Sequence, residues 1–206
     1  MKRVLWMALL ALALPMAAFA GSNTSVDFTN SGGTLTGSSS GLSLGTSELI
    51  AVNGLNGMPL STGNLGTLSF STGSLSSGNL QMGATFNGGG SFVINWAGGE
   101  GVPAGVLFNG SFTGPVTWTL ITLANGTHNY TLTGSVSGTW YNGQTVNGAT
   151  VQLTINTGKG FFNGQTTISS GDTNISASAV PEPGTLGLLG TGLVGLAGAL
   201  RLKKRA

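Results

Sequence analysis

Apolar and polar residues alternate along several segments in the middle of the chain. The longest, residues 130–140, places its aromatic and aliphatic residues and two glycines on one face, and its serines and threonines on the other. Residues 149–156 alternate in the same way, and residues 92–96 do so over a shorter length. A period of two residues is typical of a half-buried β-strand, so each segment is predicted to be a strand. Residues 21–64 carry only short apolar pairs and predict short strands.

The dipeptide Asn-Gly occurs eight times along the chain. Both residues tolerate a positive φ, which the tight turns of β-hairpins require. Each dipeptide is therefore a candidate hairpin turn. The asparagines are Asn53, Asn56, Asn87, Asn109, Asn125, Asn142, Asn147 and Asn163.

One of these turns predicts the register of a hairpin. A three-residue loop at 124–126, with its glycine left-handed, would pair Leu120 with Tyr130. The same loop would place Trp118 opposite Leu132, whereas a two-residue loop would mix the apolar and polar faces. Because a slip of one residue moves a whole apolar set to the wrong face, we predict the three-residue loop.

The domain between the chain termini is predicted to be all-β. Residues 21–179 show no helical periodicity, and the length of the chain leaves room for one domain of ordinary size. Many short antiparallel strands with regular turns are typical of two sheets packed face to face. We therefore predict an antiparallel β-sandwich of jelly-roll type, in preference to a barrel.

Aromatic residues recur with a spacing of 22 residues, and each is followed ten residues later by a tryptophan. One interpretation is a repeated platform on which sugars stack. The other is that a strand, a turn and a return strand occupy about that length, so that the aromatic residues form the core. We favour the core, because two of the tryptophans lie on apolar faces. The pairs are Phe86 and Trp96, Phe108 and Trp118, and Tyr130 and Trp140.

Residues 1–20 have the features of a secretory signal peptide. A basic head at Lys2 and Arg3 precedes an apolar stretch at 4–14. Small residues then form a cleavage site for signal peptidase. The residues that define this site are Ala18, Ala20 and Gly21.

Residues 185–200 form an uncharged apolar run that is predicted to be a single transmembrane helix. Sixteen residues span about 24 Å as a helix, somewhat under the roughly 30 Å thickness of the hydrocarbon core. A basic tail at 201–206 follows, and basic residues remain on the cytoplasmic side, so the domain would lie outside. The basic residues are Arg201, Lys203, Lys204 and Arg205.

The segment in front of this run, 180–184, reads Val-Pro-Glu-Pro-Gly. Val180, Pro181, Glu182 and Pro183, followed by a short apolar helix and a basic cluster, resemble the PEP-CTERM sorting signal. The resemblance implies cleavage by an exosortase near the tripeptide, transient anchoring in the inner membrane by the C-terminal helix, and delivery to the cell surface. It also implies an association with exopolysaccharide.

The charge of the chain is concentrated at its ends. The isoelectric point is about 9.3, yet between residues 21 and 180 a single basic residue, Lys159, stands against four acidic ones. A nucleic acid would find no basic patch there, so we predict no nucleic-acid partner. The chain has no cysteine, which excludes disulfides and thiolate metal sites.

Ionisable side chains are scarce in the predicted domain, and none forms a recognisable catalytic or metal-binding motif. Glu48 and Glu100 could serve a glycosidase only if folding brought them together. A Gly-x-Ser-x-Gly match at 37–41 lacks the strand and helix of a nucleophile elbow. Asp172 with Asn174 offers too few ligands for calcium, and His128 follows a turn as a solvated residue. We predict no catalytic residue, cofactor or metal.

The leading hypothesis is therefore an exported, non-enzymatic protein of the cell surface or extracellular matrix. Two alternatives remain from other classes. One is a carbohydrate-active enzyme that uses Glu48 and Glu100, and the other is an adhesin displayed at the surface.

Overall fold

The computed structural model describes residues 24–177, which form one compact unit of thirteen antiparallel strands. The single 3-10 turn η1 (Leu55–Gly57) follows the third strand. The strands are β1 (Thr24–Ser31), β2 (Thr34–Ser38), β3 (Gly41–Asn53), β4 (Ser61–Ser71), β5 (Leu75–Asn79), β6 (Gly83–Phe86), β7 (Gly89–Trp96), β8 (Gly105–Phe112), β9 (Val116–Thr122), β10 (His128–Trp140), β11 (Thr145–Asn156), β12 (Gln165–Thr167) and β13 (Ser170–Ala177).

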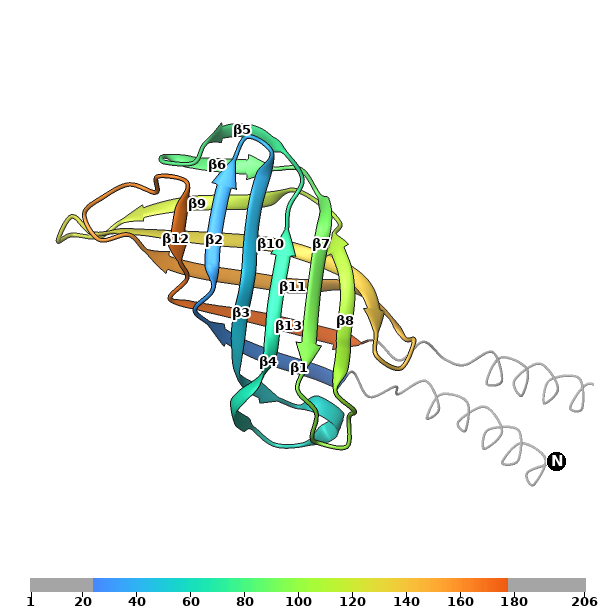
Figure 1. The fold of residues 1–206 in the computed structure, drawn as a ribbon. Helices are drawn as coiled ribbons and strands as arrows, with labels where there is room; N and C mark the ends of the chain where they lie inside the picture. Colours follow the sequence, from blue (N-terminus) through green and yellow to red (C-terminus); the bar gives the residue numbers. More distant parts are fainter. Residues whose placement is uncertain (1–23, 178–206) are drawn as a thin grey trace, which may run out of the picture. The chain divides into compact units, whose positions relative to one another are not determined.

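The strands form one sheet that closes on itself. Hydrogen bonding runs in the order β11-β13-β1-β3-β4-β7-β8-β10, and β10 pairs with β11 to complete a barrel of eight strands. The remaining strands extend this ring at two places, β9, β6 and β5 beyond β10, and β2 and β12 beside β3. In Figure 1 the strands β3, β4, β7 and β8 run steeply across β10, β11, β13 and β1.

Two long strands make the corners of the barrel. The first part of β3 pairs with β2 up to Gly45, and its second part pairs with β1 from Glu48 onward. In the same way β10 pairs with β9 up to Thr133 and with β8 from Val136 onward. Register shifts occur near both changes of partner, and such bulges bend a strand from one layer into the next.

The all-β antiparallel prediction is confirmed, but the predicted jelly-roll sandwich of two separate sheets is wrong. Alternation of apolar and polar residues tells only which side chains point inward. It is the same whether the inner faces belong to two sheets or to one sheet rolled into a barrel. The pairing of β11 with β10 decides between them, because it joins the two ends of the sheet.

The register predicted for the hairpin at 124–126 is confirmed. Leu120 pairs with Tyr130 and Trp118 pairs with Leu132. The amide of Gly126, at φ 78°, donates to the carbonyl of Leu123 over 2.9 Å, so the glycine takes the left-handed position. The alternation of residues 130–140 and 149–156 likewise places their apolar residues opposite each other across β10 and β11.

Two local predictions are wrong. The strand β3 is 13 residues long although residues 21–64 predict short strands, because its bulges shift the period-two pattern and hide its continuity. Of the predicted Asn-Gly turns, Asn109 and Gly110 lie inside β8, and Asn147 and Gly148 lie inside β11, so neither dipeptide makes a hairpin turn. Gly110 is needed there for a close approach, since a Cβ atom on it would lie 2.3 Å from the carbonyl oxygen of Ser137 on β10.

The inward-facing side chains form one continuous hydrophobic core. Its aromatic centre surrounds Phe92, whose ring lies 6.2 Å from Phe70, 6.1 Å from Phe108 and 5.9 Å from Phe112 between centroids. These rings come from β4, β7 and β8, neighbouring strands of the barrel. With no cysteine in the chain, packing and hydrogen bonds hold the domain together without disulfides.

Several predictions concern residues outside those that the structure describes. They are the signal peptide at 1–20, the tripeptide segment at 180–184, the transmembrane helix at 185–200 and the basic tail at 201–206. Within residues 24–177 no helix combines the length and the hydropathy that crossing a membrane requires.

Candidate functional site

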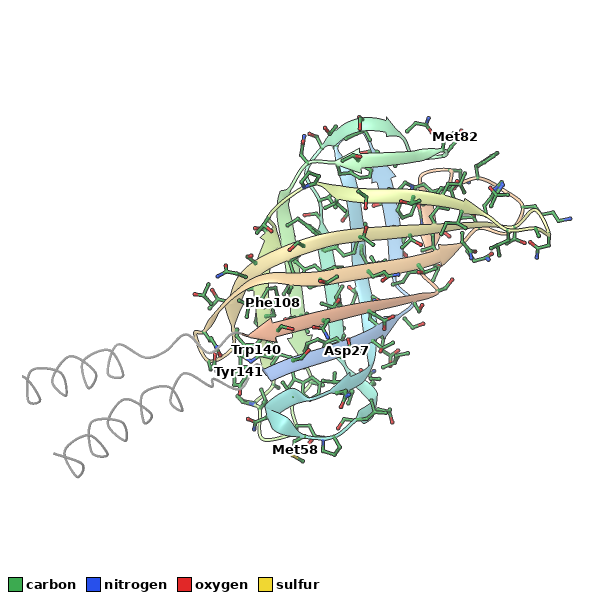
Figure 2. All side chains as sticks on the ribbon, turned by 180° about the vertical axis from the view of Figure 1, so that it is seen from behind. Asp27, Met58, Met82, Phe108, Trp140 and Tyr141 are labelled. Atoms are coloured by element: carbon green, nitrogen blue, oxygen red, sulfur yellow. The ribbon has the colours of Figure 1, made fainter. Side chains whose placement is uncertain are left out.

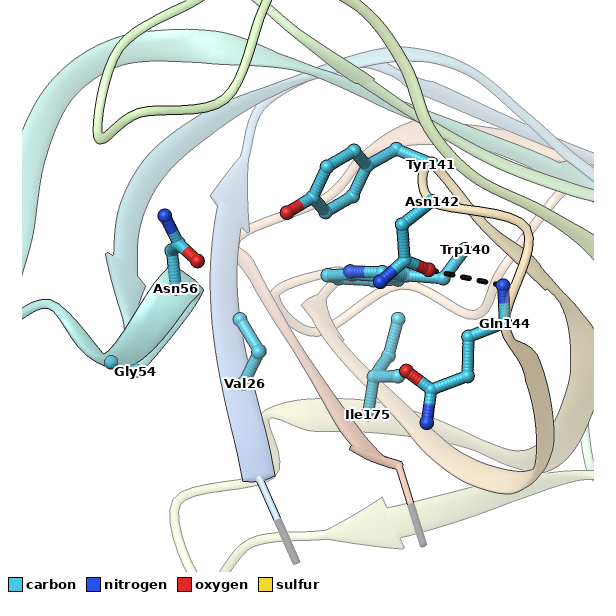
Figure 3. Close-up of a pocket in the computed structure, with 9 residues that line it drawn as sticks. Val26, Gly54, Asn56, Trp140, Tyr141, Asn142, Gln144 and Ile175 are labelled. Atoms are coloured by element: carbon cyan, nitrogen blue, oxygen red, sulfur yellow. Dashed lines mark hydrogen bonds between the residues drawn. The ribbon is translucent and has the colours of Figure 1, made fainter. Parts of the chain in front are cut away.

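A pocket of about 340 Å³ lies at the end of the barrel where β1 begins and β13 ends. We call it the end pocket (Figure 3). One wall is the turn between β10 and β11, and the other is the loop that contains η1. Side chains of β1 and β13 form the floor between them. The lining includes Val26, Asn56, Trp140, Tyr141, Asn142 and Gln144.

The turn at 140–144 is fixed by backbone hydrogen bonds. The amide of Trp140 donates to the carbonyl of Gln144, and that of Gly143 donates to the carbonyl of Trp140, each over 2.8 Å. The side-chain oxygen of Asn142 accepts the amide of Gln144 at 3.0 Å. A further backbone bond of 2.8 Å, from Tyr141 to Leu107, ties the turn to β8. The turn therefore presents its side chains from a rigid base.

Trp140 is half-buried and packs against the core on its inner side. Its ring lies 6.1 Å from Phe28 and 6.3 Å from Phe108 between centroids, both of them fully buried. The ring of Tyr141 lies 5.9 Å from the Trp140 ring between centroids, at an angle of 58°. Figure 2 shows the two rings beside Phe108 at this end of the molecule, far from Met82 at the other. The core therefore sets the orientation of the indole ring.

The opposite wall of the end pocket, the loop that contains η1, is also fixed by close contacts. Gly54 is left-handed at φ 83°, and a Cβ atom on it would lie 2.4 Å from the carbonyl oxygen of Ser25. Asn56 is also left-handed, at φ 53°, and its side-chain amide donates to the carbonyl of Glu100 at 3.3 Å. This loop therefore packs closely on β1 and directs the Asn56 amide toward the pocket, as Figure 3 shows.

The polar groups of the end pocket carry no charge. Its lining contains no Asp, Glu, Lys, Arg or His among the described residues, and its polar side chains are amides and one phenol. Within residues 24–177 neither the indole nitrogen of Trp140 nor the hydroxyl of Tyr141 makes a hydrogen bond. The described lining therefore offers groups for hydrogen bonding and stacking, and its described residues include no carboxylate, imidazole, ammonium or guanidinium group.

The two glutamates of the enzyme hypothesis do not meet. The Glu100 carboxylate accepts a hydrogen bond from Ser61, and Ser61 pairs with Val52 on β3. Glu48 lies four positions before Val52, about 13 Å along the strand, and it is exposed. A glycosidase pair requires roughly 5 to 9.5 Å between its carboxyl groups.

The other candidate residues predicted from the sequence lie at separate positions in the domain. His128 is not simply solvated, because it is half-buried with its ring stacked on Phe161 at 4.3 Å. The segment 37–41 joins two strands, not a strand and a helix. Asp172 and Asn174 are exposed on β13, and the described part of the chain contains no group of three or more potential metal-ligating side chains.

The aromatic repeat divides into core and pocket. Its first five members, Phe86, Phe108, Tyr130, Trp96 and Trp118, are buried, which confirms the core interpretation for them. Trp140 is the exception. The end pocket was not predicted from the sequence, although Tyr141, Asn142 and Gln144 directly follow this last tryptophan around an Asn-Gly turn.

The first and last strands of the domain, β1 and β13, pair with each other beside the end pocket. Thr24, at the start of β1, pairs with Ala177, at the end of β13, and Val26 pairs with Ile175 beside the end pocket. The domain therefore begins and ends side by side.

Comparisons with known proteins bear on the C-terminal segment. No curated protein and no solved structure matches the chain. A family model does match, over residues 179–204, and this range includes the tripeptide Pro181, Glu182 and Pro183 and the first basic residues of the tail. At residues 179–204 the chain carries the PEP-CTERM protein-sorting motif.

Proposed function

We propose that this protein is exported, anchored briefly in the inner membrane by residues 185–200, cleaved by an exosortase-type enzyme, and then held at the cell surface or in the extracellular matrix. It acts there by associating with exopolysaccharide and catalyses no reaction. The observation that carries the proposal is the PEP-CTERM sorting motif, which indicates an exported protein processed by exosortase. Signal peptidase would remove residues 1–20 during export.

The distribution of ionisable groups supports a non-enzymatic role. The carboxylates of Glu48 and Glu100 lie apart on the domain, and no acidic or basic side chain lines the end pocket. General acid–base catalysis needs such a group within hydrogen-bonding reach of the reacting atoms. Among the described residues, neither the two glutamates nor the lining of the end pocket provides such an arrangement.

The outer surface of the barrel supports contact with a hydrated, uncharged polymer. Across β9, β10 and β11 the outward residues form cross-strand rows of hydroxyl and amide groups. Thr119, Thr131 and Thr154 make one row, and Thr117, Thr133 and Gln152 make the next. Such groups both donate and accept hydrogen bonds, as the hydroxyls of a polysaccharide do.

Mass spectrometry of the protein from the native envelope and culture fluid tests the sorting part of the proposal. We expect a chain that starts at Gly21 and ends near Pro181. A chain that is intact through Ala206 in both fractions would contradict processing.

Fractionation of the matrix tests the association. We expect the processed protein to sediment with exopolysaccharide and to leave that fraction when the polymer is enzymatically degraded. Equal amounts of free protein with and without the polymer would contradict a role in the matrix.

A further inference from the structure

The end pocket has the properties of a site for one sugar ring. Two aromatic rings stand at its edge, and the side chain of Tyr141 is 39% exposed. A pyranose has a face of C–H groups that packs on an aromatic ring, and hydroxyls around its edge that require hydrogen bonds. The site therefore needs an apolar platform and polar groups around it, and the turn at 140–144 provides both.

The polar groups around the platform suit hydroxyls. Asn56, Asn142 and Gln144 carry amides, each of which has donors and an acceptor. The indole N–H of Trp140 and the hydroxyl of Tyr141 have no partner within residues 24–177 and are available to a ligand. The amide oxygen of Asn142 is held by the backbone of Gln144, which leaves its NH₂ group for the ligand.

The lack of charge narrows the class of ligand. A phosphate or carboxylate is held in proteins by Arg, Lys or a set of convergent backbone amides, and a cation by carboxylates. The described lining has no charged side chain of either sign. A neutral ligand therefore fits the site better than a nucleotide, a uronic acid or a metal ion.

The size and the rigidity of the end pocket also favour the binding of a small ligand. A volume of about 340 Å³ lies at the lower end of the range for small-molecule sites, roughly 300–1,000 Å³. The packing of Trp140 on Phe28 and Phe108 and the hydrogen bonds of the turn fix the platform before binding. A preformed site loses less conformational entropy on binding.

We propose that the end pocket binds one ring of a neutral polysaccharide, stacked on the Trp140 and Tyr141 rings and held by the amides of Asn56, Asn142 and Gln144. This inference rests on the proposed association with exopolysaccharide and names its binding site.

Calorimetric titration tests the site. The full chain is expressed with its own export segments and purified in the form that the cells release. The probes are four neutral hexasaccharides, of α-1,4-glucose, β-1,4-glucose, β-1,3-glucose and β-1,4-N-acetylglucosamine, with hexagalacturonate as the charged probe. We expect at least one neutral probe to bind and hexagalacturonate not to bind. Absence of binding by all four neutral probes, or binding of hexagalacturonate alone, would overturn the inference.

Variants of the platform locate the site. Because Tyr141 is exposed, Tyr141→Ala should keep the fold and weaken binding about tenfold. Trp140→Phe keeps a ring but loses the indole donor, and it should lie between Tyr141→Ala and the native protein. Phe161→Ala is the matched control, since Phe161 is 46% exposed and lies outside the pocket lining. Unchanged binding in both platform variants, or an equal loss in the control, would overturn the inference.

The outcomes separate this inference from the proposed function. Retention of the Tyr141→Ala variant in the matrix, with no hexasaccharide bound even by the native protein, would overturn the end pocket as the sugar site and leave the matrix role standing. A native protein that binds a neutral hexasaccharide through Tyr141 but never reaches the matrix would leave the pocket standing and overturn the proposed function.

Discussion

The domain contains two tryptophan–tyrosine pairs, and they differ in every property except composition. The rings of Trp118 and Tyr130 are stacked, with centroids 5.0 Å apart and planes at 17°, and both are fully buried. The rings of Trp140 and Tyr141 are tilted at 58° with centroids 5.9 Å apart, and Tyr141 is exposed. The first pair comes from neighbouring strands, whereas the second comes from consecutive residues.

The polar atoms of the two pairs differ more than their packing. The Trp118 indole donates to the carbonyl of Leu80 at 2.9 Å, and the Tyr130 hydroxyl donates to the carbonyl of Gln81 at 2.7 Å. The Tyr130 oxygen also accepts the amide of Phe162 at 3.1 Å. In the Trp140–Tyr141 pair the corresponding atoms have no partner among the described residues.

The comparison shows how the same residue types serve structure in one place and binding in another. Aromatic residues with polar tips stabilise a fold when those tips bond internally, because a buried donor or acceptor without a partner is costly. When the tips face solvent on a rigid base, they remain available for a ligand. Hydrogen bonding of the tips therefore separates the two roles better than burial of the rings.

The largest difference between the pairs should appear when a tryptophan is removed. Trp118→Ala deletes a fully buried ring and two aromatic contacts, and it should lower the free energy of unfolding by about 3–5 kcal/mol. Trp140→Ala should cost less, because its ring is only half-buried. Denaturant unfolding followed by circular dichroism measures both values. Equal losses of unfolding free energy in the two variants would contradict the proposed difference between the pairs.

Removal of a single tyrosine hydroxyl should also affect stability differently in the two pairs. Tyr130→Phe leaves the buried amide of Phe162 without its acceptor and should cost about 1–3 kcal/mol. Tyr141→Phe is the matched control and should change stability by less than about 0.5 kcal/mol, because its hydroxyl bonds nothing within residues 24–177. The same unfolding assay applies. A larger loss in Tyr141→Phe than in Tyr130→Phe would contradict the assignment.

Two turn glycines allow a matched test of positioning. Gly143, in the turn of the end pocket, and Gly126, in the β9–β10 turn, have φ of 84° and 78°, and neither has a heavy atom near its missing Cβ. Replacement by alanine should cost about 1–2 kcal/mol at either site. Only Gly143→Ala should also weaken hexasaccharide binding, since it disturbs Tyr141 and Asn142. Weaker binding in Gly126→Ala alone would show that the pocket is not the site.

The smallest effect is expected from the two glutamates. The double variant Glu48→Gln, Glu100→Gln should change neither hexasaccharide affinity nor the amount of polymer-bound protein, because neither carboxylate lines the end pocket. The Asn56 amide bonds the backbone carbonyl of Glu100, which a side-chain substitution leaves in place. A product released from the hexasaccharides by the native protein and absent with this variant would revive the enzyme hypothesis.

Local features of the domain were predictable where neighbours in sequence decide them. The three-residue hairpin at 124–126 follows from one glycine and the alternation on either side of it, and the structure has that register. The long strand β3 was not predictable, because its bulges interrupt the period between Leu44 and Ser47. Asn109 and Gly110 failed as a turn signal, because Gly138 of β10, distant in the sequence, packs against them.

The amino-acid sequence by itself determined the all-β class, the inward faces of the strands and the sorting motif at 179–204, because these depend on short-range periodicity and on a contiguous motif. Only the tertiary structure decided that the sheet closes into a barrel and that Trp140 leaves the core. Both depend on the arrangement of residues distant in the chain, because β11 pairs with β10, and the η1 loop and the 140–144 turn line the same pocket. Alternation specifies which face of a strand is buried, but it carries no information about which strand will cover that face.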